Sequence, residues 1–215
     1  KTKYSKTYRL DNGLCETEIY NKSVHYLDNG QYVNIDNTLI EHDNCYQNNK
    51  NAYLVTFPKS LKSNEIEINY LDQSLKLYYD NIDSTAILDK DVDRSVENLQ
   101  DFIYYPVNEK TIIKYDILNE SLKENIILSS YIDNFSYSFF LEIDLSLQNQ
   151  EDKLYFYNDD ELVFLFDNYL MYDKDYTVSH DIQITINQIN ETTYKINVIP
   201  SNEYLENASY PVTID

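Results

Sequence analysis

The segment Phe135–Leu147, FSYSFFLEIDLSL, places an apolar side chain at every second position. A period of two is typical of a β-strand with one buried face, because successive side chains leave opposite sides of the backbone. A helix over the same residues would spread these apolar groups around its circumference and would bury Glu142 and Asp144 with them. The pattern therefore predicts one strand of ~13 residues, which would span roughly 43 Å at ~3.3 Å per residue.

Short alternating runs separated by turn residues recur along the whole sequence, and no amphipathic helix of three turns is expected. In two places the tripeptide Asp-Asn-Gly supplies the turn of a tight hairpin, since Asn and Gly tolerate positive φ. The predicted hairpins join 4–10 to 15–20, 24–27 to 31–35 and 66–70 to 75–79. This organisation predicts an all-β protein built from antiparallel sandwiches or barrels rather than from βαβ units.

Further strands are expected at 52–57, 102–106, 111–118, 122–128, 154–157, 162–166, 181–188, 193–199 and 209–215. The polar stretch 36–51 is expected to be a loop, and the alternation weakens between residues 80 and 101. We therefore expect two packed antiparallel β-sandwich-like subdomains, residues 1–88 and 99–215, built from hairpins and meanders and joined by a linker at 89–98.

The net charge restricts the classes of partner. Lysine and arginine number 17 against 37 aspartates and glutamates, which gives a net charge of −20. That field repels phosphate backbones, so nucleic acid is not an expected partner, whereas it suits a soluble extracellular protein. No apolar run approaches the ~20 residues that a membrane helix needs, so no membrane insertion is expected. The N-terminal residues do not resemble a signal peptide, so we expect that an export signal was removed or lies upstream.

Tyrosine and cysteine usage leaves alternatives open. There are 23 tyrosines, no tryptophan and two glycines. Exposed tyrosines on strands can stack on sugars, but an AT-rich genome produces the same composition without functional pressure. Cys15 and Cys45 lie 30 residues apart, with no His or Cys at ligand spacing. They either pair in an oxidising compartment or remain ordinary thiols.

Catalytic and metal-binding motifs are not found in the sequence. It contains no nucleophile elbow, phosphate loop, HExxH or Cys-His signature. His25, His42 and His180 have no histidine at the i+2 or i+4 spacing of a metal pair. Carboxylates are so numerous that a glycosidase pair cannot be selected among them. We therefore expect no enzyme, no cofactor, and no catalytic, cofactor-binding or metal-binding residue.

Two acidic segments raise the question of calcium, because hard cations prefer clustered oxygens. Asp89, Asp91 and Asp93 alternate, but Ser95 and Gln100 occupy the positions where an EF-hand loop carries Gly and Glu. Asn158–Glu161 is acidic and lies between two expected strands. The favoured interpretation of the first segment is a solvated linker or one short helical turn, and that of the second segment is a solvated turn.

Three blocks of the sequence resemble a known family. They are HYLDNGQYVNIDNTL within Val24–Leu39, IKYDI with LKENIIL within Ile113–Leu128, and YPVTID at Tyr210–Asp215. In this order they are similar to the β-rich N-terminal module of secreted, cell-wall-associated bacterial proteins that carry DNRLRE domains and RHS/YD repeats. Tyr32 stands where that family often has tryptophan, and most glycines of the family's turns are absent.

This resemblance implies a non-catalytic extracellular structural or interaction module of a large secreted or cell-wall-associated, RHS/polymorphic-toxin-like protein. Its partners would be neighbouring domains of a longer chain, together with protein or glycan at the cell surface, and the family offers no catalytic residues to transfer. The alternatives are a carbohydrate-binding module or glycan-active enzyme domain, and a calcium-stabilised adhesin domain. Coplanar exposed tyrosines, or two inward carboxylates ~5–9 Å apart, would favour the glycan-related alternatives.

Overall fold

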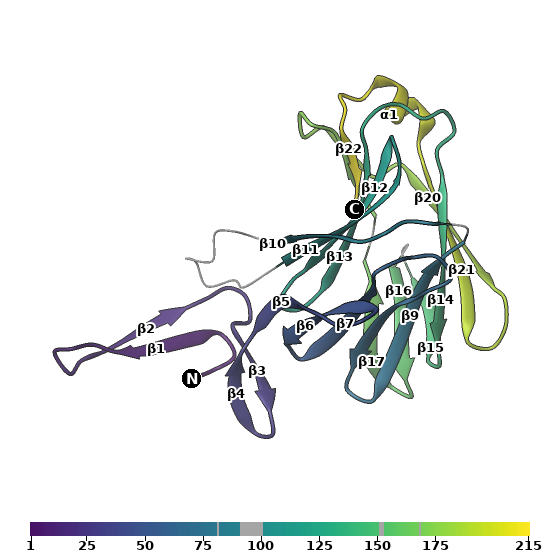
Figure 1. Ribbon diagram of the computed structural model, residues 1–215. Helices are drawn as coiled ribbons and strands as arrows, with labels where there is room; N and C mark the ends of the chain where they lie inside the picture. Colours follow the sequence, from purple (N-terminus) through teal and green to yellow (C-terminus); the bar gives the residue numbers. More distant parts are fainter. Residues whose placement is uncertain (81, 91–100, 151–152, 168) are drawn as a thin grey trace.

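The computed structural model describes residues 1–80, 82–90, 101–150, 153–167 and 169–215. The described residues form antiparallel β-sheets with a single short helix, α1 (Asn202–Asn207), which confirms the predicted all-β, sandwich-like class (Figure 1). None of the described helical residues forms a segment long and apolar enough to span a bilayer.

The larger sheet combines strands from both ends of the sequence. Its order is β20 (Ile182–Gln188), β21 (Thr193–Pro200), β14 (Tyr137–Ile143), β9 (Gln73–Tyr79), β8 (Ile66–Tyr70), β7 (Tyr53–Pro58), β6 (Cys45–Lys50) and β5 (Asp36–Glu41). Strand β14 joins the two groups, because Leu141 lies opposite Leu77 of β9 on one side and Tyr194 of β21 on the other. The expected division into 1–88 and 99–215 therefore does not coincide with a division of the sheets.

The second large sheet packs against the first. Its order is β10 (Ile87–Lys90), β11 (Asp101–Asn108), β12 (Thr111–Ile117), β13 (Leu122–Leu128), β22 (Val212–Ile214), β18 (Met171–Tyr172) and β19 (Val178–Ser179). The expected linker at 89–98 begins inside β10, and residues 91–98 lie outside the described residues.

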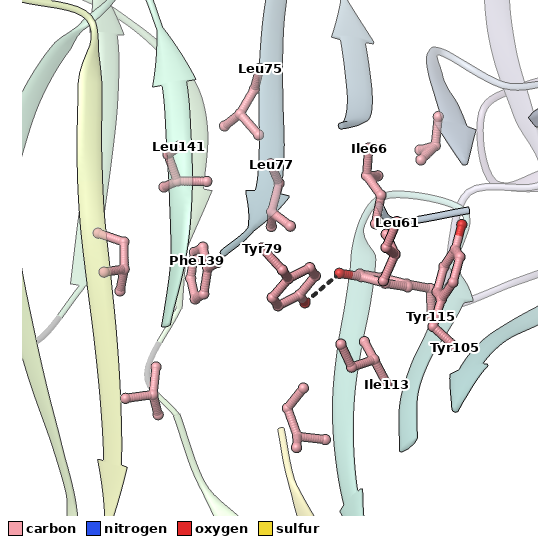
Figure 2. Packing of buried hydrophobic residues seen from close by; sticks show 14 of the residues in the cluster. Leu61, Ile66, Leu75, Leu77, Tyr79, Tyr105, Ile113, Tyr115, Phe139 and Leu141 are labelled. Carbon is pink, nitrogen blue, oxygen red and sulfur yellow. Dashed lines mark hydrogen bonds between the residues drawn. The ribbon is translucent and has the colours of Figure 1, made fainter. Parts of the chain in front are cut away.

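One hydrophobic core fills the space between these two sheets. On β9 the residues Leu75, Leu77 and Tyr79 are buried at every second position, as the predicted hairpin 66–70/75–79 requires. Figure 2 shows this row beside Phe139 of β14 and opposite Tyr115 of β12. The core residues of both sheets belong to one continuous cluster.

Three smaller units complete the fold. The predicted N-terminal hairpins are present as β1 (Ser5–Arg9) with β2 (Cys15–Ile19) and β3 (His25–Asp28) with β4 (Gln31–Asn34). Gly13 and Gly30 adopt φ of 81° and 79°, the left-handed geometry that their turns require. Hairpin β1–β2 projects away from the body of the molecule (Figure 1). Strands β15 (Ser146–Gln150), β16 (Lys153–Asn158) and β17 (Glu161–Phe166) form a separate meander.

The predicted single strand over Phe135–Leu147 is wrong, because the chain bends at Asp144–Leu145. Strand β14 ends at Ile143, opposite Leu75 of β9, and β15 then pairs with β16 in another sheet. Leu145 stays buried at the bend. Apolar residues therefore stay at every second position although the chain passes from one sheet to another. Periodicity alone cannot reveal the break between the two strands.

The predicted loop over 36–51 is also wrong, since β5 and β6 occupy most of it. Buried amides take the place of apolar side chains on edge strand β5 and on its neighbour β6. Asn48 accepts a hydrogen bond from the backbone N–H of Val55 at 2.7 Å and donates to Oδ1 of Asn37 at 3.3 Å. Asn51 donates to the same Asn37 oxygen at 3.0 Å. Such mutual hydrogen bonding lets polar residues be buried in a strand.

Candidate functional site

A cavity of about 860 Å³ lies between the inner faces of the two large sheets, with β17 and β3 contributing to its wall. The apolar part of the wall includes Leu75 and Leu77 of β9 and Phe164 of β17. The opposite part includes Tyr115 of β12 and Glu124 of β13. This volume and the mainly apolar wall with a few polar groups are typical of small-molecule sites.

Glu124 is a half-buried carboxylate on the core-facing side of β13. It lies opposite Tyr115 in the β12–β13 register, and it shares a face of β13 with Ile126 and Leu128, which are buried. Sequence reasoning did not single it out. Its position in the sequence could have identified it. Leu122, Ile126 and Leu128 are apolar at every second position of this strand, and Glu124 occupies the one position of that series that is charged.

A chain of hydrogen bonds connects Glu124 to the facing sheet. The Tyr79 hydroxyl donates to Oε1 of Glu124 at 2.5 Å, and the hydroxyls of Tyr79 and Tyr115 lie 2.7 Å apart (Figure 2). Because the Tyr79 proton is used toward Glu124, Tyr115 is the donor in the second bond. The chain joins β9 of the larger sheet to β12 and β13 of the second sheet.

Four buried or partly buried tyrosines surround this carboxylate. We call Tyr79, Tyr115, Tyr137 and Tyr169 the tyrosine cluster. Burial raises the pKa of Glu124 to about 7, and the hydrogen bond from Tyr79 acts in the opposite, smaller sense. Burial also raises the pKa of each tyrosine in the cluster, so all four hydroxyls stay protonated near neutral pH. Glu124 is therefore the group in the cluster that titrates near neutrality.

The other carboxylates on the cavity wall differ from Glu124, because each forms an ion pair. Glu120 lies 2.8 Å from Nζ of Lys3, Asp215 lies 2.6 Å from Nζ of Lys123, and Asp167 lies 2.7 Å from Nζ of Lys153. Among the described residues, no lysine or arginine forms an ion pair with Glu124. The cavity therefore contains one carboxyl group that is not neutralised by a side-chain cation.

A second cavity, of about 570 Å³, lies on the other side of the tyrosine cluster. Tyr79 and Tyr137 are on its wall, whereas Tyr115 and Tyr169 are on the wall of the larger cavity with Glu124. The tyrosine cluster thus contributes side chains to the walls of both cavities, and the hydrogen bond between Tyr79 and Tyr115 connects the two walls.

The three histidines lie on different elements. His25 of β3 is fully buried on the wall of the larger cavity, and its Nδ1 is 2.8 Å from the backbone oxygen of Thr2. His42 and His180 are exposed, in the β5–β6 turn and before β20. Across the described ranges, no three His, Cys, Asp or Glu side chains are grouped so that they could hold a metal ion.

The two acidic segments and the cysteines are placed as follows. Residues 158–161 form the exposed β16–β17 turn, in which Asp159 has a φ of 51°. Asp89 lies in β10, while Asp91 and Asp93 lie outside the described residues. Cys15 is exposed on β2 and Cys45 is partly buried on β6, and both thiols are free.

Two aromatic side chains on the outer face of the larger sheet stack on each other. Tyr78 and Phe140 lie opposite each other on β9 and β14 and stack with ring centroids 5.0 Å apart and an interplanar angle of 7°. Nζ of Lys195 lies 5.2 Å from the Phe140 ring centroid. This stack uses ring faces for contacts within the protein. It therefore leaves less ring surface for stacking on a sugar than two rings lying flat on the sheet would leave.

Comparison with protein-family models, with curated proteins and with solved structures found no match to this chain.

Proposed function

We propose that this chain is a non-catalytic extracellular structural and interaction module of a large secreted or cell-wall-associated bacterial protein. The observation that carries the proposal is the concentration of exposed apolar side chains on the N-terminal hairpins. Seven of the eighteen large apolar side chains that are exposed among the described residues fall within the first 35 residues. Leu14 and Ile19 of hairpin β1–β2 are 64% and 83% exposed.

A projecting two-stranded hairpin with apolar side chains needs a partner to be well ordered. Isolated two-stranded hairpins are only marginally stable in water, and clustered exposed apolar groups mark interaction surfaces. Within the described residues, β1 and β2 form a sheet of two strands, and a sheet of this kind can be extended by a strand from a partner. The three most exposed of these seven side chains, Leu14, Ile19 and Leu27, are aliphatic, which favours a protein partner over a glycan. The other four are Leu10 and the tyrosines Tyr4, Tyr8 and Tyr32.

The partner that we propose is a neighbouring domain of a longer chain, as the three resembling blocks also suggest. The carboxylates of the larger cavity support a non-catalytic module, since Glu120, Asp167 and Asp215 are each held by a lysine rather than facing Glu124 as a free pair. Secretion is supported by the net charge of −20, which suits a soluble extracellular protein.

The test measures binding of the purified chain to the domains that adjoin it in its full-length protein, expressed separately, and to a glycan and cell-wall array. We expect binding to the adjoining domains and a loss of at least about tenfold in affinity in the double variant Leu14→Ser/Ile19→Ser. The matched control is Ile189→Ser, which changes an exposed apolar residue in the β20–β21 turn and should bind as the wild type does. Binding to glycans without binding to the domains would instead support the carbohydrate-binding alternative.

The proposed location has its own test. Antibody detection after fractionation of the producing cells should recover the protein in the medium or the cell-wall fraction. Recovery only in the cytosol would contradict an extracellular role.

A further inference from the structure

We propose that the cavity between the two sheets binds a small organic cation, with an ammonium group on the Glu124 carboxylate and an apolar body along the partly exposed side chains of Ile68, Leu122 and Phe164. This inference is independent of the proposed interaction surface, because the cavity lies between the sheets whereas β1–β2 projects from them (Figure 1).

The carboxyl group of Glu124 has no cationic partner among the described side chains of the cavity wall. Glu124 receives a hydrogen bond from Tyr79, but the lysines on the cavity wall, Lys3 and Lys123, pair with other carboxylates. A desolvated carboxylate without a cation is unfavourable, and a cation bound beside it restores the balance. A ligand with a positive charge should therefore bind at this position with a more favourable free energy than a neutral ligand of the same size.

An aromatic ring lies on the cavity wall together with the carboxylate. Tyr169 of the tyrosine cluster shares this wall with Glu124 and is only partly buried, whereas Tyr115 is fully covered by its neighbours. The negative faces of aromatic rings attract cations, and ammonium groups are commonly recognised by such rings together with a carboxylate. An anionic ligand would be repelled by the negative ring faces and by the carboxylate. It would also be repelled by the protein's net charge of −20.

The cavity has room for more than a charged group. Its volume of about 860 Å³ is larger than an ammonium ion needs, and the partly exposed side chains of Ile68, Leu122 and Phe164 give it an apolar side. Burial of these groups against an alkyl or aryl body contributes to binding, whereas a bare inorganic cation would leave that side in contact with water. The geometry thus favours an amine with an apolar body over a metal ion.

The test compares three probes of similar size by calorimetric titration at pH 8: n-hexylamine, which is cationic, 1-hexanol and hexanoate. We expect n-hexylamine to bind the wild type about 10-fold to 100-fold more tightly than 1-hexanol, since hydrogen bonds to charged groups are the stronger ones. Glu124→Gln should remove this preference, because the amide keeps the shape and loses the charge. Glu109→Gln, in the exposed β11–β12 turn, should retain it and controls for cations held by the acidic surface.

A second measurement uses the wild type alone, so the inference stays testable if Glu124→Gln does not fold. An ammonium ligand ionises Glu124, and at pH 6.5 its binding should release a proton that appears as a dependence of the enthalpy on the buffer. The other titratable groups on the wall, besides tyrosines, are Lys3, His25, Glu120, Lys123, Asp167 and Asp215. At pH 9 Glu124 is already ionised and the release should vanish, whereas a proton donated by a lysine would appear there. Equal affinity for n-hexylamine and 1-hexanol, or binding at pH 6.5 without proton release, would overturn the proposal.

Discussion

Glu124→Gln should change how the stability of the fold depends on pH. Burial raises the pKa of Glu124 to about 7 from an ordinary value of 4.5. The folded protein therefore holds a proton that the unfolded chain releases. The stability that this proton contributes is present in full below about pH 4.5 and is lost as the pH rises through about 7. Glutamine stays neutral throughout, and its amide oxygen can still accept the hydrogen bond from Tyr79.

The size of the effect follows from the two pKa values. At about 1.4 kcal/mol for each tenfold change in the protonation equilibrium, ionising Glu124 in the folded state lowers the free energy of unfolding by about 3 kcal/mol. Near pH 4.5 the wild type and Glu124→Gln should unfold with free energies that agree within about 1 kcal/mol. Above pH 8 the variant should be more stable by about 3 kcal/mol.

The assay is equilibrium unfolding in urea between pH 4.5 and 9, followed by circular dichroism. The quantity of interest is the difference between variant and wild type, since the net charge of −20 makes both curves depend on pH. Glu109→Gln removes one charge from an exposed turn and should follow the wild type at every pH. If the free energies of unfolding of the wild type and Glu124→Gln changed in parallel with pH, Glu124 would not ionise near neutral pH in the folded protein. That result would refute the raised pKa of Glu124.

Three further substitutions test the core. Tyr79→Phe removes the central hydroxyl of the hydrogen-bond chain and should lower the free energy of unfolding in urea by about 1–3 kcal/mol, whereas Tyr176→Phe at an exposed site should change little. Asn48→Ala leaves the Val55 N–H without its acceptor, and the expected loss is also about 1–3 kcal/mol, with the absence of any loss contradicting the buried amide network. Phe139→Ala empties a fully buried site and should lower the free energy of unfolding by at least about 3 kcal/mol. A smaller decrease would indicate that the two sheets move together and fill the space.

Local turn chemistry and alternation predicted much of the fold correctly. Gly13 and Gly30 identified the two N-terminal hairpins, because few other residues suit the positive φ of those turns. The alternation at Leu75, Leu77 and Tyr79 identified a buried strand face. Both signals are contained within a few consecutive residues, which is why one sequence suffices to read them.

Long-range features escaped sequence reasoning. The break at Asp144–Leu145 depends on which strands lie beside the chain, and the strands at 36–51 depend on buried hydrogen bonds such as Asn48 to Asn37. The candidate site has the same origin, because Tyr79 and Glu124 come from different sheets and are 45 residues apart. The sequence of β13 shows a charged residue, Glu124, at a position where the alternation expects an apolar one. It does not show which side chains form hydrogen bonds with Glu124.

The pairing of β9 with β14 has a consequence for synthesis on the ribosome. When residues up to Tyr79 have emerged, the hydrogen-bonding edge of β9 must wait for Tyr137–Ile143 before it is covered. During that interval an apolar strand with a free edge is exposed to other nascent chains, which is the situation in which edge-to-edge aggregation begins. Slow translation between these two strands should therefore lower the soluble yield, and a chaperone that shields nascent strands should restore it.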